Sequence, residues 1–289
     1  MLFRSLGIRI VRNRLMRSLT LSQEHYILEC VKKFDLERAN GVATPMTGDR
    51  LSIKDQPPET HIPRQARYRQ MVGSGLFIAV STRPDIAYAI AECARHVSNP
   101  GPAHMTALNR VFRYLKATAS LGLHYHLSAD PFNTLIGAMD SDWAGCPDTR
   151  RSTTGNVSML NGAAIAWRSK RQSSVALSSA EAEYMAGSTQ VQEVISLRKL
   201  LTNLGFPQHE PTIIYADNAT CISWSEGSVA GSNRAKHVDL RIHFLHDAVK
   251  AGHIMLQKID TKHNFSDILT KPTIPVDSFA FLRRKLLGH

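Results

Sequence analysis

Residues 134–167 decide the fold class, and their sequence is TLIGAMDSDWAGCPDTRRSTTGNVSMLNGAAIAW. The apolar run at the start of this stretch predicts a buried strand that ends at Asp140. Two further apolar runs, at 155–160 and 163–167, are separated only by Asn161-Gly162. An Asn-Gly pair between two strands is a strong signal for a two-residue hairpin turn. The stretch therefore predicts three consecutive strands of one sheet.

The elements that follow this stretch alternate between helices and strands. Ser178 or Ser179 is expected to cap a long helix over 180–204, which Gly205 closes. A strand predicted at 213–215 leads to Asp217, and a short helix follows it. The remaining predicted elements are a helix over 235–250, a strand at 253–259 and a helical stretch from Phe265. Three strands followed by alternating helices and strands predict an α/β fold, a mixed sheet flanked by helices.

The first 120 residues have a different, mostly helical and basic pattern. Residues 1–23 contain five arginines and no acid, which is the composition of a mitochondrial presequence. Their apolar residues alternate with polar or small ones, however, which favours a short basic hairpin with strands near 6–10 and 19–21. A helix capped by Ser22 is predicted to end before Gly41, and two further helices are predicted over 84–97 and 103–118, with an exposed linker at 44–63.

Composition excludes several classes of protein. The uninterrupted apolar runs, such as the one at 76–80, are far shorter than the roughly 20 residues of a membrane helix, so we expect no membrane partner. The four cysteines are widely dispersed, which argues against a disulfide framework or a zinc knuckle. The net charge is +11, and residues 1–130 carry 18 basic and 10 acidic side chains. This excess predicts a polyanionic partner, nucleic acid before a membrane surface.

Four carboxylates stand at the ends of predicted elements. Asp140 and Asp217 end strands, Glu183 lies in the first turn of the long helix, and Asp267 lies near the start of the last helical stretch. Brought together, they would repel one another unless a hard divalent cation such as Mg²⁺ bound between them. Each acid taken alone is more typical of a solvated or helix-capping side chain than of a metal ligand.

Six ordered blocks in residues 130–289 resemble one known family closely. They are MDSDWAG at 139–145, RSTTG at 151–155, ALSSAEAEYMA at 176–186, IYADN at 214–218, AKHVDLRIHF at 235–244 and SDILTKP at 266–272. These blocks resemble the ribonuclease H region of copia-type retrotransposon Pol polyproteins. The segments LGI at 6–8, LTLSQ at 19–23, TPM at 44–46, YRQMVGS at 68–74, TRPDIA at 82–87 and RYLK at 113–116 resemble the end of the reverse transcriptase in the same polyproteins.

The resemblance implies a domain division and a fold. Residues 1–125 are expected to be a mostly helical thumb and connection remnant of a reverse transcriptase with a short β-hairpin. Residues 126–289 are expected to form a ribonuclease H-like mixed five-stranded sheet flanked by helices. The family's polymerase motif contains paired aspartates, and no Asp-Asp pair occurs in this sequence, so polymerase activity is not expected from this chain alone.

The resemblance also implies an activity, the cleavage of the RNA strand of RNA:DNA hybrids. The family's metal ligands fall on Asp140, Glu183, Asp217 and Asp267, which are expected to hold two Mg²⁺ ions, with Mn²⁺ as an alternative. Asp142 and Glu181 are neighbours that could be confused with these ligands. Contacts with nucleic acid are expected from Arg150, Arg151, Ser179, Asn218, Lys236 and Arg241. The two arginines equally suit a solvated sheet edge, and Ser179 equally suits a helix cap.

Further expectations concern partners and alternatives. The expected partners are the RNA:DNA hybrid and either the rest of a reverse transcriptase or another polyprotein copy, with no small-molecule cofactor. A functional element would place the chain in a cytoplasmic virus-like particle or the nucleus. His263 is an open candidate for proton or product transfer. The alternatives are an inactive or co-opted transposon remnant that at most binds nucleic acid, and an organellar basic protein.

Overall fold

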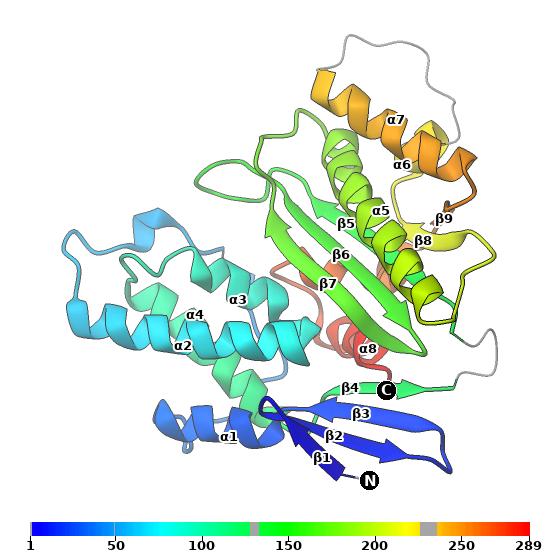
Figure 1. The fold of residues 1–289 in the computed structure, drawn as a ribbon. Coiled ribbons are helices and arrows are strands. Elements are labelled where there is room, and N and C mark those ends of the chain that lie inside the picture. The colour runs from blue at the N-terminus through cyan, green and yellow to red at the C-terminus, as the bar shows by residue number, and fades with distance from the viewer. Residues whose placement is uncertain (1, 49, 128–132, 226–235) are drawn as a thin grey trace. The chain divides into compact units, whose positions relative to one another are not determined.

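The structure, a computed structural model, describes residues 2–48, 50–127, 133–225 and 236–289 (Figure 1). The chain divides into two units, and we describe each separately. The first consists of residues 1–127 together with 271–289, and the second of residues 128–270. The boundary predicted after residue 125 lies next to this division, and the C-terminal segment groups with the first unit.

The first unit combines an antiparallel sheet with a set of helices. Its sheet has the order β1-β2-β3-β4, so the predicted hairpin is present as β2 and β3 within a larger sheet. The strands are β1 (Leu2–Ser5), β2 (Ile8–Asn13), β3 (Ser18–Ser22) and β4 (Leu123–His126). The helices are α1 (Glu24–Lys33), α2 (Ile62–Ser81), α3 (Ala87–Ala94), α4 (Pro102–Ala117) and α8 (Val276–Leu287), with 3₁₀ turns η1 (Ile53–Asp55) and η2 (Pro84–Ile86).

Several expectations for this unit were wrong. The first helix ends at Lys33, well before Gly41, and the linker predicted as exposed at 44–63 contains the buried residues Met46 and Leu51.

The start of the first helix and a further helix also differ from expectation. Ser22 does not cap α1, because it is the last residue of β3 and pairs with Arg9, and Gln23 takes the N-cap position. Helix α2 was not predicted, although its buried residues recur with a helical period. Gly73 and Gly75 lower the helix propensity of this stretch by roughly 1 kcal/mol each. Gly75 allows a close approach to α3, since a Cβ there would lie 2.4 Å from Ile90 Cδ1.

A fully buried ion pair anchors the core of the first unit. The Arg83 guanidinium donates from Nε to Asp85 Oδ1 (2.9 Å) and from Nη2 to Asp85 Oδ2 (2.7 Å), and both side chains are buried. The Tyr114 hydroxyl donates to the same carboxylate, and Arg283 of α8 donates to that hydroxyl. Burial raises the pKa of the Asp85 carboxyl, but the charge and hydrogen bonds of Arg83 and Tyr114 outweigh it and lower the pKa below its usual value.

The second unit contains the predicted mixed sheet. Its order is β7-β6-β5-β8-β9, in which β5, β6 and β7 pair antiparallel and β5, β8 and β9 pair parallel. The strands are β5 (Ile136–Asp142), β6 (Thr153–Leu160), β7 (Ala163–Arg171), β8 (Thr212–Ala216) and β9 (Ile254–Lys258). Asn161 and Gly162 both have positive φ in the turn between β6 and β7, as the hairpin prediction requires. The predicted mixed five-stranded sheet flanked by helices is thus confirmed.

Helices cover this sheet, with α5 crossing one face over β5 and β6 (Figure 1). They are α5 (Ser179–Asn203), α6 (Ala219–Ser225) and α7 (Lys236–Lys250), and the 3₁₀ turns are η3 (Thr261–His263) and η4 (Asp267–Leu269). Ser178 caps α5 by accepting the Glu181 N–H, which settles the choice between Ser178 and Ser179. The core between sheet and helices includes Met139, Tyr184 and Val191.

Two boundaries in the second unit differ from expectation. Strand β5 does not end at Asp140 but continues to Asp142, because its pairing with β6 extends to Thr153. The helical stretch predicted from Phe265 is only the short turn η4, since α8 begins later, at Val276. No helix in the described parts of the chain has the length and apolar character needed to cross a membrane.

We expect Asp85→Asn to destabilise the first unit by about 3–5 kcal/mol at pH 7, because it leaves the buried Arg83 charge uncompensated. The lowered pKa means that the Asp85 carboxylate stabilises the fold above its unfolded pKa of about 3.9, and that this stabilisation is lost as the pH falls below that value. Denaturant unfolding is followed by circular dichroism at pH 7 and pH 3. The difference in unfolding free energy between variant and parent should be smaller at pH 3.

The matched control is Asp35→Asn, which removes an exposed ion pair with Arg67. It should change the unfolding free energy by less than about 1 kcal/mol. The assigned role of the buried pair would be contradicted if Asp85→Asn lowered the unfolding free energy as little as Asp35→Asn does, or by the same amount at both pH values.

Candidate metal centre

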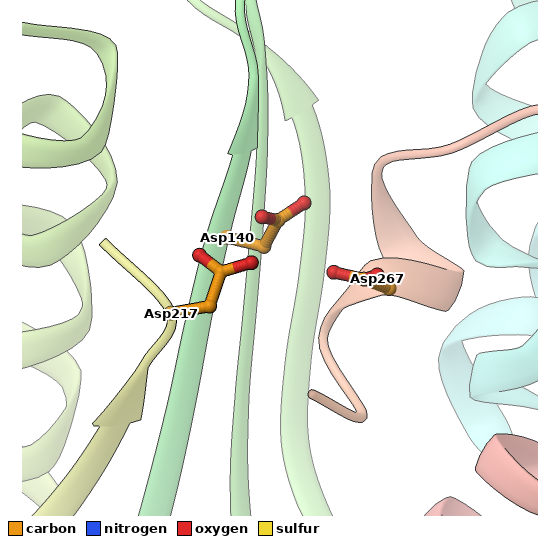
Figure 2. Close-up of side chains that lie close together, drawn as sticks. All are labelled: Asp140, Asp217 and Asp267. Carbon is orange, nitrogen blue, oxygen red and sulfur yellow. The ribbon is translucent and has the colours of Figure 1, made fainter. Parts of the chain in front are cut away.

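Three aspartates from different elements meet near the carboxyl ends of β5 and β8 in the second unit's sheet (Figure 2). One carboxylate oxygen from each of Asp140, Asp217 and Asp267 lies within 4.8 Å of the others. Asp140 and Asp267 are buried and Asp217 is half-buried. Asp140 is on β5, Asp217 directly follows β8, and Asp267 is the first residue of η4.

The register of the sheet explains why Asp140 and Asp217 are neighbours. Strands β5 and β8 are parallel, with Ala138 opposite Tyr215. Asp140 and Asp217 each lie two residues further along, and side chains two residues apart along a strand point to the same face. The two carboxylates therefore lie side by side although they are far apart in the sequence.

The chemistry of this group suits a hard divalent cation. Carboxylate oxygens are the ligands that Mg²⁺ and similar ions prefer, and three negative charges at this spacing repel one another in the absence of a cation. The three aspartates could therefore bind a divalent metal ion, which fits three of the four predicted ligands.

Glu183, the fourth predicted ligand, lies beside the three-aspartate group but is not part of it. It is buried on α5, and its Oε1 accepts the backbone N–H of Ser141, the residue after Asp140 (3.3 Å). Burial raises the pKa of the nearby Cys221 thiol, and the negative charge of Glu183 raises it further. The role of Glu183 as a ligand stays a prediction.

The two neighbours that could be confused with the ligands lie outside the three-aspartate group. Glu181 Oε2 accepts the backbone N–H of Leu177 (2.8 Å) and so stabilises the start of α5. Asp142 is the last residue of β5 and pairs with Thr153. Both residues therefore offer controls for the predicted ligands.

Gln172 holds the start of α5 against the sheet and was not identified from the sequence. Its buried Nε2 donates to Ala182 O (2.9 Å), Thr154 Oγ1 (3.0 Å) and Ser141 Oγ (3.3 Å). The amide thus ties the helix that carries Glu183 to the strands that flank Asp140. No local pattern could have found it, because its partners come from three separate elements.

Gly155 provides the space in which the η4 turn lies. It is opposite Asp140 in the pairing of β5 with β6. A Cβ at this position would lie 2.6 Å from Thr270 Cγ2 and 3.0 Å from both Leu269 Cβ and the Ser266 carbonyl oxygen. The last residue of the RSTTG block therefore has a steric role, since only glycine lets the turn with Asp267 approach β6 this closely.

The predicted nucleic-acid contacts occupy varied positions. Arg150 is exposed and Arg151 half-exposed in the loop after β5, where their backbones bond to Cys146. Asn218 Oδ1 accepts the Cys221 N–H and so caps α6, and Arg241 lies within 3.4 Å of the Ser188 hydroxyl on α5. Ser179 is exposed in the first turn of α5, and the side chain of Lys236 lies outside the described residues. Their contacts with nucleic acid stay predictions.

Comparisons with known proteins place the chain among transposon polyproteins. No family model matches it. It is 38% identical over 98% of its length to the retrovirus-related Pol polyprotein from transposon TNT 1-94 of Nicotiana tabacum, and 34% identical over 95% to that from transposon RE2 of Arabidopsis thaliana. The chain spans about a fifth of the length of these relatives.

A solved structure, LC11-RNase H1 isolated from compost, aligns with 48% of this chain and 94% of its own. The alignment has 16% identity and a TM-score of 0.37.

We expect Gly155→Ala to weaken divalent-metal binding, because its Cβ displaces the turn that carries Asp267 and overpacking costs about 1–3 kcal/mol. The measurement is the increase in thermal unfolding temperature of the second unit on adding Mn²⁺, which should shrink in the variant. Gly73→Ala on α2, whose Cβ would meet nothing within 4 Å, is the control and should keep the parent's increase. An undiminished increase in Gly155→Ala would contradict the steric role.

Proposed function

The chain belongs to the family of retrovirus-related Pol polyproteins from copia-type transposons, and we propose that it cleaves the RNA strand of RNA:DNA hybrids in a metal-dependent reaction. The observation that supports this most directly is the group of three aspartates near the carboxyl ends of β5 and β8. We assign a ribonuclease H-like domain to residues 126–289, of which 271–289 group with the first unit, and a reverse-transcriptase remnant to residues 1–125. Polymerase activity is not part of the proposal, because the sequence has no adjacent aspartate pair.

The proposed ligands are Asp140, Asp217 and Asp267, with Glu183 as the fourth. Two Mg²⁺ ions, or Mn²⁺, would supply an activated water and stabilise the leaving 3′ oxygen of the RNA. The three aspartates provide oxygen ligands from separate elements, so the position of each is fixed by the sheet and by η4. Glu183 accepts a backbone N–H from the residue after Asp140, which fixes its carboxylate beside the same strand.

Substrate binding is assigned to basic and polar groups. Phosphate contacts from Arg150 and Arg151 need no sequence readout and suit a hybrid of any sequence. Ser179 and Asn218 adjoin two of the proposed ligand positions and are candidates for contacts with the RNA 2′-hydroxyls, which distinguish RNA from DNA. The net charge of +11 supports a polyanionic substrate.

We expect the purified chain to cut the RNA of a labelled RNA:DNA hybrid in Mg²⁺, and Asp140→Asn and Asp217→Asn to lower the rate by about 10²-fold or more. Each substitution removes one of the proposed metal ligands from the group, which weakens the stabilisation of transition-state charge. The controls are Asp142→Asn and Glu181→Gln, which also replace a carboxylate by an amide but lie outside the three-aspartate group. Both should retain most of the parent's rate.

If the parent cuts no hybrid, the enzymatic proposal fails, and the alternative of an inactive or co-opted remnant that at most binds nucleic acid is favoured. If all four variants cut as well as the parent, the assignment of Asp140 and Asp217 as metal ligands fails.

We also expect hybrid affinity to fall steeply with salt, as it does when phosphate binding releases counterions. Replacing Arg150 and Arg151 by alanine should lower the slope of log affinity against log salt by about one for each phosphate that the variant no longer neutralises. Lys199→Ala, at an exposed position late in α5, is the control and should leave the slope unchanged. These affinities are measured in the Asp217→Asn background, in which the proposal makes cleavage slow enough for binding to be recorded first.

A further inference from the structure

One short segment, residues 261–270, contacts all three aspartates of the candidate metal centre. It supplies Asp267 itself. At one end, Thr261 Oγ1 donates to Asp217 Oδ2 (3.0 Å), and at the other, Thr270 Oγ1 donates to Asp140 Oδ2. The segment therefore binds these two carboxylates through two hydroxyl groups, of which that of Thr270 lies in the SDILTKP block and that of Thr261 lies outside the quoted blocks.

The middle of the segment is fixed to β5 and to itself. Asn264 Nδ2 donates to the carbonyl of Met139, the residue before Asp140 (3.2 Å). Asn264 Oδ1 accepts the Ser266 hydroxyl (2.6 Å), and the Asp267 N–H donates to the Asn264 carbonyl (3.1 Å). Asn264 and Ser266 are completely buried. These bonds hold the segment in one conformation next to Asp140.

We propose that Thr270 and Thr261 are positioning residues that orient the Asp140 and Asp217 carboxylates for metal binding. A carboxylate has two oxygens and several lone pairs, so a hydroxyl bound to one oxygen restrains the group and leaves acceptor sites for a cation. A hydroxyl is also neutral, so it orients the carboxylate without supplying the positive charge that would compete with a metal. Hydrogen-bonding partners of this kind orient metal ligands in many proteins.

The two threonine hydroxyls should differ in how strongly they restrain their carboxylates. Thr270 is completely buried, and its Oγ1 is also 3.2 Å from the Asp267 carbonyl oxygen, so the hydroxyl touches two of the three aspartate residues. Thr261 is exposed, where water can replace its hydroxyl as a donor to Asp217. Removal of the Thr270 hydroxyl is therefore expected to have the larger effect.

The proposal rests on the metal-dependent function proposed above and is tested by metal binding without substrate. Mg²⁺ and Mn²⁺ are titrated calorimetrically into the full chain for the parent, Thr270→Val, Thr270→Ser and Thr261→Val. We expect Thr270→Val to weaken metal binding about tenfold. Thr270→Ser restores the hydroxyl and should bind within about twofold of the parent, and Thr261→Val should lose less affinity than Thr270→Val.

Controls separate positioning from a general effect on folding. Thr202→Val removes a hydroxyl that donates to the Arg198 carbonyl on α5, and it should bind metal like the parent. Circular dichroism in metal-free buffer reports folding for every variant. Because Thr261 is exposed, Thr261→Val tests the proposal even if Thr270→Val does not fold.

Three results would overturn the positioning role. These are parent-like metal affinity in both folded valine variants, an equal loss of affinity in Thr270→Ser and Thr270→Val, and the absence of metal binding by the parent. A parent that binds metal, weakens in Thr270→Val and yet cuts no hybrid would refute the proposed function while supporting the positioning role. Parent-like metal affinity in the valine variants, in a chain that cleaves hybrids, would refute only the positioning role.

Discussion

The mutual repulsion of three carboxylates is the constraint on which the second unit's organisation depends. Two unit charges 4 Å apart interact by about 4 kcal/mol at an effective dielectric constant of 20, so the aspartates would separate if their backbones were free to move. They are held by different elements, namely β5, the end of β8 and the turn η4. The fixed register of the sheet, the space left by Gly155 and the neutral donors of the 261–270 segment all oppose this separation.

Much of the fold could be predicted because its signals are local. The turn at Asn161-Gly162 and the cap of α5 need only a few neighbouring residues. The turn was found in the sequence, and the cap was narrowed to Ser178 or Ser179, of which Ser178 is correct. Helix α2 was missed because its two internal glycines lower helix propensity, while the packing that compensates for them involves Ile90 of another helix. The end of β5 was misplaced for a similar reason, since pairing with β6, not the apolar pattern, determines where the strand stops.

The three aspartates that meet could be predicted from the sequence, but the residues that hydrogen-bond around them could not. Asp140, Asp217 and Asp267 stand at element ends within recognisable sequence blocks, so the residues that meet could be named in advance. The hydroxyl of Thr270 and the amide of Gln172 act through partners far away in the sequence, and threonine or glutamine at such positions has no chemical signature of its own. Only the three-dimensional arrangement distinguishes them from ordinary polar residues.

The membership of α8 in the first unit has a consequence for synthesis. Tyr114 of α4 packs edge-to-face on Phe279 and bonds with Arg283, both of which the ribosome adds more than a hundred residues later. Since the intervening segment 128–270 forms a unit with its own core, it can collapse first, while the earlier-made helices still lack their final partner. Residues 1–127 would then complete their packing against α8 only after segment 128–270 has been made.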